Sequence, residues 1–96
     1  MIVHIVMFKF KEEKKEENIL VVKSRLEELV SKIPMLNDLE VGVDFNKSER
    51  AFDLSLYSTF DNIENLKAYA VHPEHLKVVA LIKEVTVESK VVDYSL

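Results

Sequence analysis

The side chains best suited to acid–base chemistry are gathered in one short segment, Tyr-Ala-Val-His-Pro-Glu-His at positions 69–75. A histidine with an ordinary pKa near 6.5 accepts protons at neutral pH, so His75 is a candidate general base for an acidic carbon beside a carbonyl. The phenol of Tyr69 is a candidate hydrogen-bond donor to the enolate oxygen that would then form. We therefore predict His75 and Tyr69 as the catalytic residues, should the protein catalyse a reaction.

Both side chains also have a purely structural interpretation. The ring of His75 could hydrogen-bond across the start of a helix, and Tyr69 could be a buried tyrosine whose hydroxyl has a partner. Six positions separate the two residues, which on a continuous helix puts them on roughly opposite faces. A break at His72 and Pro73 would let both side chains reach one cavity. We expect His72 to cap the helix after the break, with Pro73 at its first position.

A third histidine, His4, lies on the same face of an apolar strand as Val6 and Phe8. We expect these three residues to line a pocket, although a hydrogen-bonded core histidine is an alternative interpretation of His4. His4, His72 and His75 together would be a sufficient ligand set for zinc. Because His72 is expected to cap a helix while His75 points inward, we predict no metal site, and we expect no cofactor.

The composition predicts one domain over residues 1–96. Hydrophobic residues make up 48% of the chain, which is high for a protein that buries only about 60–65% of its unfolded surface. The absence of cysteine excludes disulfides and thiol nucleophiles. A net charge of −4 argues against nucleic acid as a partner. No apolar run approaches the roughly 20 residues of a membrane helix and the start is a poor signal peptide, so we expect no membrane partner and a cytoplasmic location.

Hydrophobic periodicity predicts the order strand, helix, strand, strand, broken helix, strand. The expected elements are a strand at 2–11, an amphipathic helix at 12–33 ended by Pro34, strands at 39–45 and 52–60, a helix begun by Asp61 and Glu64, a helix from 73 to about 85, and a strand at 91–96. In the helix after Asp61, Ile63, Leu66 and Ala70 are expected to face inward. This βαββαβ plan predicts an α+β, ferredoxin-like fold with a four-stranded antiparallel sheet and helices on one face.

The first strand is apolar on both faces, because Val3, Ile5 and Met7 alternate with the residues of the pocket face. Helices would cover only one side of the sheet. The other side would then be an apolar patch of several hundred square ångströms, which soluble monomers rarely expose. We therefore expect a homodimer in which two sheets pack face to face around a two-fold axis.

Three segments, in this order, resemble one known family: His-Ile-Val-Met-Phe-Lys-Phe-Lys at 4–11, the segment at 69–75, and Val-Val-Asp-Tyr at 91–94. They resemble the stress-responsive α/β-barrel (Dabb) domain of the dimeric α+β barrel superfamily, over essentially the whole chain. The resemblance implies a homodimer whose two sheets form a barrel, with a pocket in each subunit between sheet and helices.

The resemblance leaves the activity open. Many members of the family have no assigned reaction, some are stress-induced, and a plant branch contains a polyketide cyclase that uses a tyrosine and a histidine in the context Tyr-x-x-His-Pro-x-His. Tyr69 and His75 stand at the two matching positions, and His4 matches a further pocket histidine. Haem degradation, which occurs elsewhere in the superfamily, is not expected, since the chain has no tryptophan.

Two hypotheses follow from the residues and the resemblance. In the first, the protein is a stress-responsive homodimer that binds a small apolar or aromatic molecule without turning it over. In the second, it is a cofactor-independent polyketide cyclase or isomerase, with His75 as the base and Tyr69 as the donor to the enolate.

Overall fold

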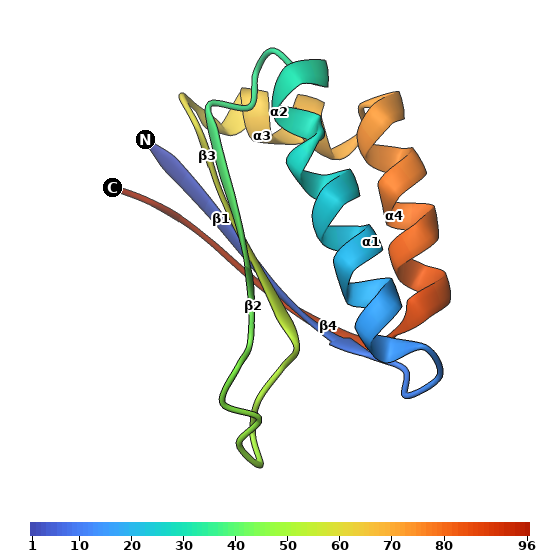
Figure 1. The fold of residues 1–96 in the computed structure, drawn as a ribbon. Coiled ribbons are helices and arrows are strands. Elements are labelled where there is room, and N and C mark those ends of the chain that lie inside the picture. Colours follow the sequence, from blue (N-terminus) through green and yellow to red (C-terminus); the bar gives the residue numbers. More distant parts are fainter.

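The computed structural model describes residues 1–96 and consists of a four-stranded antiparallel sheet with its helices packed on one face (Figure 1). The strands lie in the order β2-β3-β1-β4. The elements are β1 (Ile2–Phe10), α1 (Lys15–Glu27), α2 (Leu29–Lys32), β2 (Asp38–Val43), β3 (Leu54–Phe60), α3 (Ile63–Ala70), α4 (Pro73–Val85) and β4 (Thr86–Ser95). The predicted ferredoxin-like α+β fold is confirmed.

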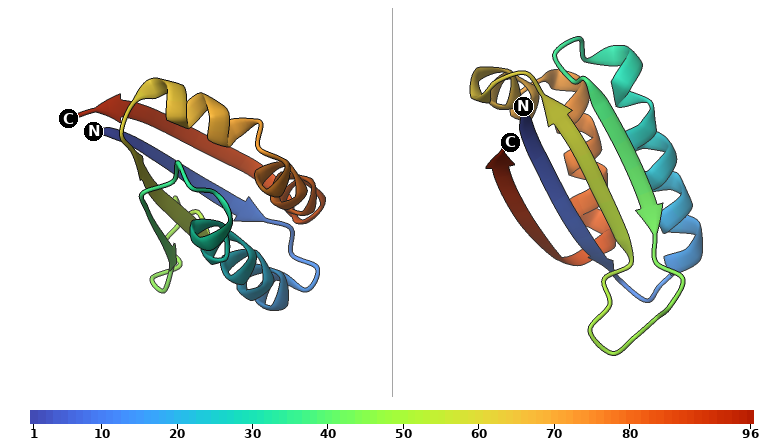
Figure 2. Two further views of the ribbon diagram at one scale, coloured as in Figure 1. Left: turned by 90° about the horizontal axis from the view of Figure 1, so that it is seen from above. Right: turned by 90° about the vertical axis from the view of Figure 1, so that its left-hand side faces the viewer.

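Strand β1 is central, as its two apolar faces indicate. It pairs with β3 from Ile2 opposite Phe60 to Phe8 opposite Leu54, and with β4 along its other edge. Figure 2 shows α1 and α4 side by side over one face of the sheet, while the opposite face is uncovered. None of these helices is long and apolar enough to cross a membrane.

The core fills the space between the covered face and the helices. Its buried members from the helices include Ile19, Val22, Leu26, Val78 and Ile82, and those from the sheet include Phe8, Phe10, Leu54, Leu56 and Phe60. Every second side chain of each strand faces the helices, and the helices face the sheet with residues spaced three or four apart. These two sets pack together as a single apolar core.

The helix expected over 12–33 is in fact two helices. It begins three residues later than expected, after Lys14, whose backbone is left-handed with a φ of 52°. At the junction with α2, the backbone N–H of Glu28 donates to the carbonyl of Ser24, and the chain turns there. Leu29 and Ile33 continue the buried stripe of Leu26 across this junction, whereas the side chain of Val30 lies beside the stripe and is exposed.

The start of α3 differs from the expected capping box. Asn62, not Asp61, caps the helix, because its side-chain oxygen accepts the N–H of Asn65 at 2.8 Å. The carboxylate of Asp61 instead accepts a hydrogen bond from the Asn37 side chain at 2.7 Å. The cap therefore lies one residue later, and Asp61 ties the end of β3 to the segment before β2.

The inward side of α3 also differs from the expectation. Ile63 and Ala70 are exposed, Leu66 is half-buried, and Tyr69 is the buried residue of this helix. Helix α3 lies beside one end of the sheet rather than over its middle (Figure 1), so only a narrow stripe of it meets the core. Tyr69 is thereby placed in the interior.

The strand ends were predicted less well than the strands themselves. Strand β2 stops at Val43, so Phe45 lies in the following loop, where it is 90% exposed. Strand β4 begins at Thr86 rather than at residue 91, because its first residues pair with the last part of β1 as far as Phe10 opposite Thr86. A register shift between Lys9 and Phe10 accompanies this pairing.

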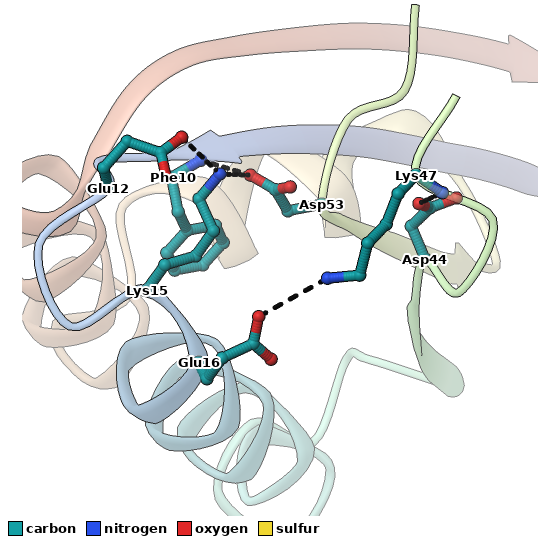
Figure 3. A network of polar contacts seen from close by, with 7 residues as sticks. All are labelled: Phe10, Glu12, Lys15, Glu16, Asp44, Lys47 and Asp53. Atoms are coloured by element: carbon teal, nitrogen blue, oxygen red, sulfur yellow. Dashed lines mark hydrogen bonds and ion pairs between the residues drawn. The ribbon is translucent and has the colours of Figure 1, made fainter. Parts of the chain in front are cut away.

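A network of polar contacts joins the end of β1, the start of α1 and the loop between β2 and β3 (Figure 3). Asp53 is its centre: its carboxylate accepts the backbone N–H of Phe10 at 2.7 Å and lies 3.7 Å from the ammonium of Lys15. Asp44 accepts the backbone N–H of Lys47 at 2.7 Å at the exposed edge of the same network.

We expect Asp53→Ala to lower the free energy of unfolding by about 1–2 kcal/mol, since it leaves the partly buried N–H of Phe10 without an acceptor. Urea denaturation measures this change. Asp44→Ala is the matched control, because water can replace its exposed carboxylate, and we expect it to cost less than about 0.5 kcal/mol. Equal losses of stability in the two variants would show that the hydrogen bond from Phe10 to Asp53 contributes no more than the exposed bond of Asp44.

Candidate functional site

The helical segment is interrupted between α3 and α4 at His72 and Pro73, where the sequence predicts the break. His72 is the N-cap of α4: its Nδ1 accepts the backbone N–H of Glu74 at 3.1 Å, and Pro73 occupies the first helical position, where its missing N–H costs nothing. The predicted capping role of His72 is confirmed. This bond engages Nδ1 of His72, and we assign the residue no role beyond capping α4.

The break brings Tyr69 and His75 together. Tyr69 lies in the last turn of α3 and His75 in the first turn of α4, and their ring centroids are 4.3 Å apart with the planes at 42°. The ring of Phe60 packs on Tyr69 at 5.0 Å, and the ring of His4 approaches it edge-on at 6.2 Å. One residue from α4, one from β3 and one from the central strand β1 thus surround the phenol ring of Tyr69.

The hydroxyl of Tyr69 is buried and has no hydrogen-bond partner, in a residue that is 1% exposed. Burial raises the pKa of this phenol to about 12, so it stays protonated at neutral pH and acts as a donor rather than as a base. Leaving a buried hydroxyl unpaired costs roughly 1–3 kcal/mol, so native proteins rarely do so.

The tautomer of His75 follows from its hydrogen bond to the end of α3. Nδ1 lies 3.0 Å from the backbone carbonyl of Ala70, which can only accept, so Nδ1 carries the proton and donates it. Nε2 then has a free lone pair. Burial lowers the pKa of His75, so the ring is neutral at pH 7 and Nε2 is available as a proton acceptor.

His4 is held in a similar way by a residue that sequence reasoning missed. Its Nδ1 hydrogen-bonds the carboxylate of Asp93, which stands directly opposite His4 on β4. The carboxylate accepts, so Nδ1 donates, and Nε2 of His4 makes no hydrogen bond within the chain. The signal in the sequence was an aspartate between Val92 and Tyr94, but its partner depends on the register of β1 and β4.

A cavity of about 270 Å³ lies between the covered face of the sheet and α4. Its lining consists of His4, Val6, Phe8, Leu26, Leu56, His75, Val78, Val79, Ile82, Lys83, Thr86, Ser89 and Val91. The four predicted residues His4, Val6, Phe8 and His75 are among them. Tyr69 is not: it lies behind the wall of the cavity, in contact with the two imidazoles.

Four other hollows are larger, at about 390, 460, 490 and 560 Å³, but none of them is lined by a histidine. The one of about 460 Å³ surrounds the polar network of Lys15 and Asp53, and the one of about 490 Å³ lies on the uncovered sheet face near Met7. No group of three or more histidine, aspartate or glutamate side chains is close enough to hold a metal ion. The cavity beneath α4 is therefore the candidate site.

The neutral state of His75 predicts a pH dependence of stability. The unfolded ring has a pKa near 6.5 and the folded ring a lower one, so the unfolded state binds more protons below pH 6.5. The stability contributed by the neutral ring is fully present above that pH and is lost as the pH falls through the folded pKa. In urea denaturation, wild type should lose more stability between about pH 7.5 and pH 5.5 than His75→Asn, whose amide keeps the bond to Ala70 without titrating. Identical pH profiles would contradict the assigned cause.

Comparison with protein families gives one match. The model of the Stress responsive A/B Barrel Domain (Dabb) family matches residues 2–96. Among curated proteins, none matches the chain.

Solved structures with the same fold are numerous. A dimeric protein of unknown function with a ferredoxin-like fold from Bacteroides fragilis is 34% identical, with a TM-score of 0.91 over 99% of this chain and 95% of that one. A dimeric ferredoxin-like protein from Thermobifida fusca is 24% identical, with a TM-score of 0.88 over 99% and 90%. A hydroxynitrile lyase from Passiflora edulis is 20% identical, with a TM-score of 0.86 over 97% and 90%. The last two likenesses show the fold alone.

Proposed function

The chain belongs to the stress-responsive A/B barrel (Dabb) domain family, and we propose that it is a homodimer that binds a small apolar or aromatic molecule in the cavity beneath α4. The observation that carries this proposal is the lining of that cavity: mostly apolar side chains, with the imidazoles of His4 and His75 at its edge. A volume of about 270 Å³ lies near the lower end of ligand sites, so a molecule with a single ring suits it.

The dimer part of the proposal concerns the uncovered sheet face, which we call the outer face. By strand register it comprises Val3, Ile5 and Met7 of β1, Ser55, Tyr57 and Thr59 of β3, Lys90, Val92 and Tyr94 of β4, and Asp38, Glu40 and Gly42 of β2. Large apolar side chains on it, including Met7, Val92 and Tyr94, are exposed in the single subunit. A second copy packed on this face would remove them from water, and the relatives from Bacteroides fragilis and Thermobifida fusca are dimeric.

Binding is tested by titrating the protein with 3-phenylpropan-1-ol and following methyl NMR signals. We expect saturable shifts at Val78, Val79 and Val91, which line the cavity. Val79→Phe should fill the cavity and weaken binding at least tenfold, because the added ring occupies the space of the ligand. Val21→Phe on the exposed side of α1 is the matched control and should leave binding unchanged. If the shifts spread over the surface, or if Val79→Phe binds as wild type does, the cavity is not the site.

A second candidate function is favoured by the unpaired hydroxyl of Tyr69 beside the neutral ring of His75. In a cofactor-independent cyclase or isomerase, Nε2 of His75 would take a proton from the carbon next to a carbonyl. The electron pair of that C–H bond would move to the carbonyl oxygen, which Tyr69 would stabilise by donating a hydrogen bond. The hydroxyl lies behind the cavity wall, so a substrate oxygen reaches it only when side chains of that wall move.

Proton abstraction is measured as solvent deuterium exchange at the carbon next to the carbonyl of 4-phenylbutan-2-one. An enzyme should accelerate this exchange over buffer, and His75→Asn should return it to the background rate, because the amide has no basic nitrogen. His72→Asn keeps a capping side chain outside the cavity and is the control expected to retain activity. Exchange at the background rate with wild type would leave the binding proposal standing and end this one for simple ketones.

A further inference from the structure

We propose that the cavity beneath α4 selects an apolar molecule that carries a carboxylate, such as a small aromatic acid, and that the ammonium of Lys83 pairs with this carboxylate. The inference rests on the proposed function, since it takes the cavity to be a binding site. It adds the chemical class of the ligand and the residue that selects it.

The first observation is the sign of the charge at the cavity. The chain has seventeen acidic residues against thirteen basic ones, yet none of the residues that line the cavity is acidic. Lys83 is the one permanently charged side chain in the lining. Asp93 stands next to the cavity, but it is bonded to Nδ1 of His4 and is not part of the lining. The cavity therefore favours an anion in a chain that is acidic as a whole.

The second observation is that Lys83 has no partner within the chain. Six of the eleven lysines form an ion pair, whereas Lys83 forms none. It lies in the last turn of α4, where the helix dipole already favours a cation without neutralising it. Its charge is thus available to a ligand.

The third observation is a hydroxyl at the same end of the cavity. Ser89 lines the cavity and its hydroxyl makes no hydrogen bond within the chain, so it can donate to a carboxylate. Thr86 also lines this end, but its hydroxyl already donates to the carbonyl of Ile82 at 2.8 Å. An ammonium and a free hydroxyl together match the two oxygens of one carboxylate.

The two polar ends of the cavity set the length of the ligand. His75 and Lys83 are eight positions apart on α4, which corresponds to about 12 Å along the helix axis. Between them, Val78, Val79 and Ile82 offer an apolar wall. A single aromatic ring with a short chain ending in a carboxylate spans this distance with its ring against the wall.

The test compares two probes of the same shape, 3-phenylpropanoate and 3-phenylpropan-1-ol, by titration calorimetry. Wild type should bind the propanoate about five- to tenfold more tightly, which is typical of a partly exposed ion pair with a hydrogen bond. Lys83→Met should remove this preference and leave the affinity for the alcohol within about twofold, while Lys83→Arg should keep it. Lys67→Met, which removes an exposed lysine of α3 outside the cavity, is the charge-matched control and should behave as wild type.

The outcomes separate this inference from the proposed function. If wild type binds the alcohol but prefers it to the propanoate, or if Lys83→Met keeps the preference for the anion, the selection by Lys83 is wrong while the cavity remains a binding site. If neither probe binds wild type, the cavity is not a site for such molecules, and both proposals are overturned. A preference lost equally in Lys67→Met would show an effect of net charge and would also contradict the inference.

Discussion

Val92→Asp should dissociate the dimer into folded monomers. Val92 stands opposite Ile5 on the outer face and is 52% exposed in the single subunit, so the subunit tolerates a carboxylate there. In a face-to-face dimer, the two-fold axis brings two copies of that carboxylate into a buried apolar layer. An unpaired charge in such a layer costs about 3 kcal/mol or more, which raises the dissociation constant at least about a hundredfold.

Sedimentation velocity at micromolar concentration measures the change, and circular dichroism verifies that the monomer is folded. Val21→Asp, on the exposed side of α1, is the matched control and should remain dimeric. Val3→Asp is a poorer test, because Val3 is 0% exposed within one subunit and a charge there would unfold the subunit itself. A Val92→Asp variant that sediments as wild type would place the dimer contact elsewhere.

Tyr69 should respond in opposite directions to two substitutions. Tyr69→Ala should lower the free energy of unfolding by about 3–5 kcal/mol, because it leaves a cavity between Phe60 and His75. Tyr69→Phe should raise the free energy of unfolding by about 1 kcal/mol, since it removes a buried hydroxyl that has no partner and keeps the ring. The hydroxyl would then be a group kept at a cost in stability, as expected of a functional donor.

Denaturant unfolding of the two variants beside wild type measures both effects. Ser48→Ala is the control for the loss of a hydroxyl, because Ser48 is exposed in the loop between β2 and β3, away from the outer face, and the change should stay within about 0.5 kcal/mol. Should Tyr69→Phe be less stable than wild type, the hydroxyl has a partner in solution. Tyr69 would then be a structural tyrosine, and the enzyme hypothesis would lose the observation that favours it.

The element order, the ferredoxin-like fold and the central place of β1 could be predicted from local patterns. Apolar residues on both faces of β1 indicate a strand with neighbours on both edges, and the proline at position 73 indicates a new helix start. The proximity of Tyr69 and His75 follows from that break, because two short helices can turn both rings to one side. These features depend on residues close together in the chain, where periodicity and capping chemistry act. The chemical role of the two rings stays a prediction.

Other features depend on residues that only the folded chain brings together. His4 meets Asp93 across 89 positions because the register of β1 and β4 puts them opposite each other, and a shift of one residue would separate them. The same packing closes the hydroxyl of Tyr69 behind the cavity wall and gathers Lys83 and Ser89 at the far end. The residue types of the segment at 69–75 were visible in the sequence, but tertiary packing decided which ring nitrogens make no bond, which hydroxyl is buried without a partner and which lysine lines the cavity.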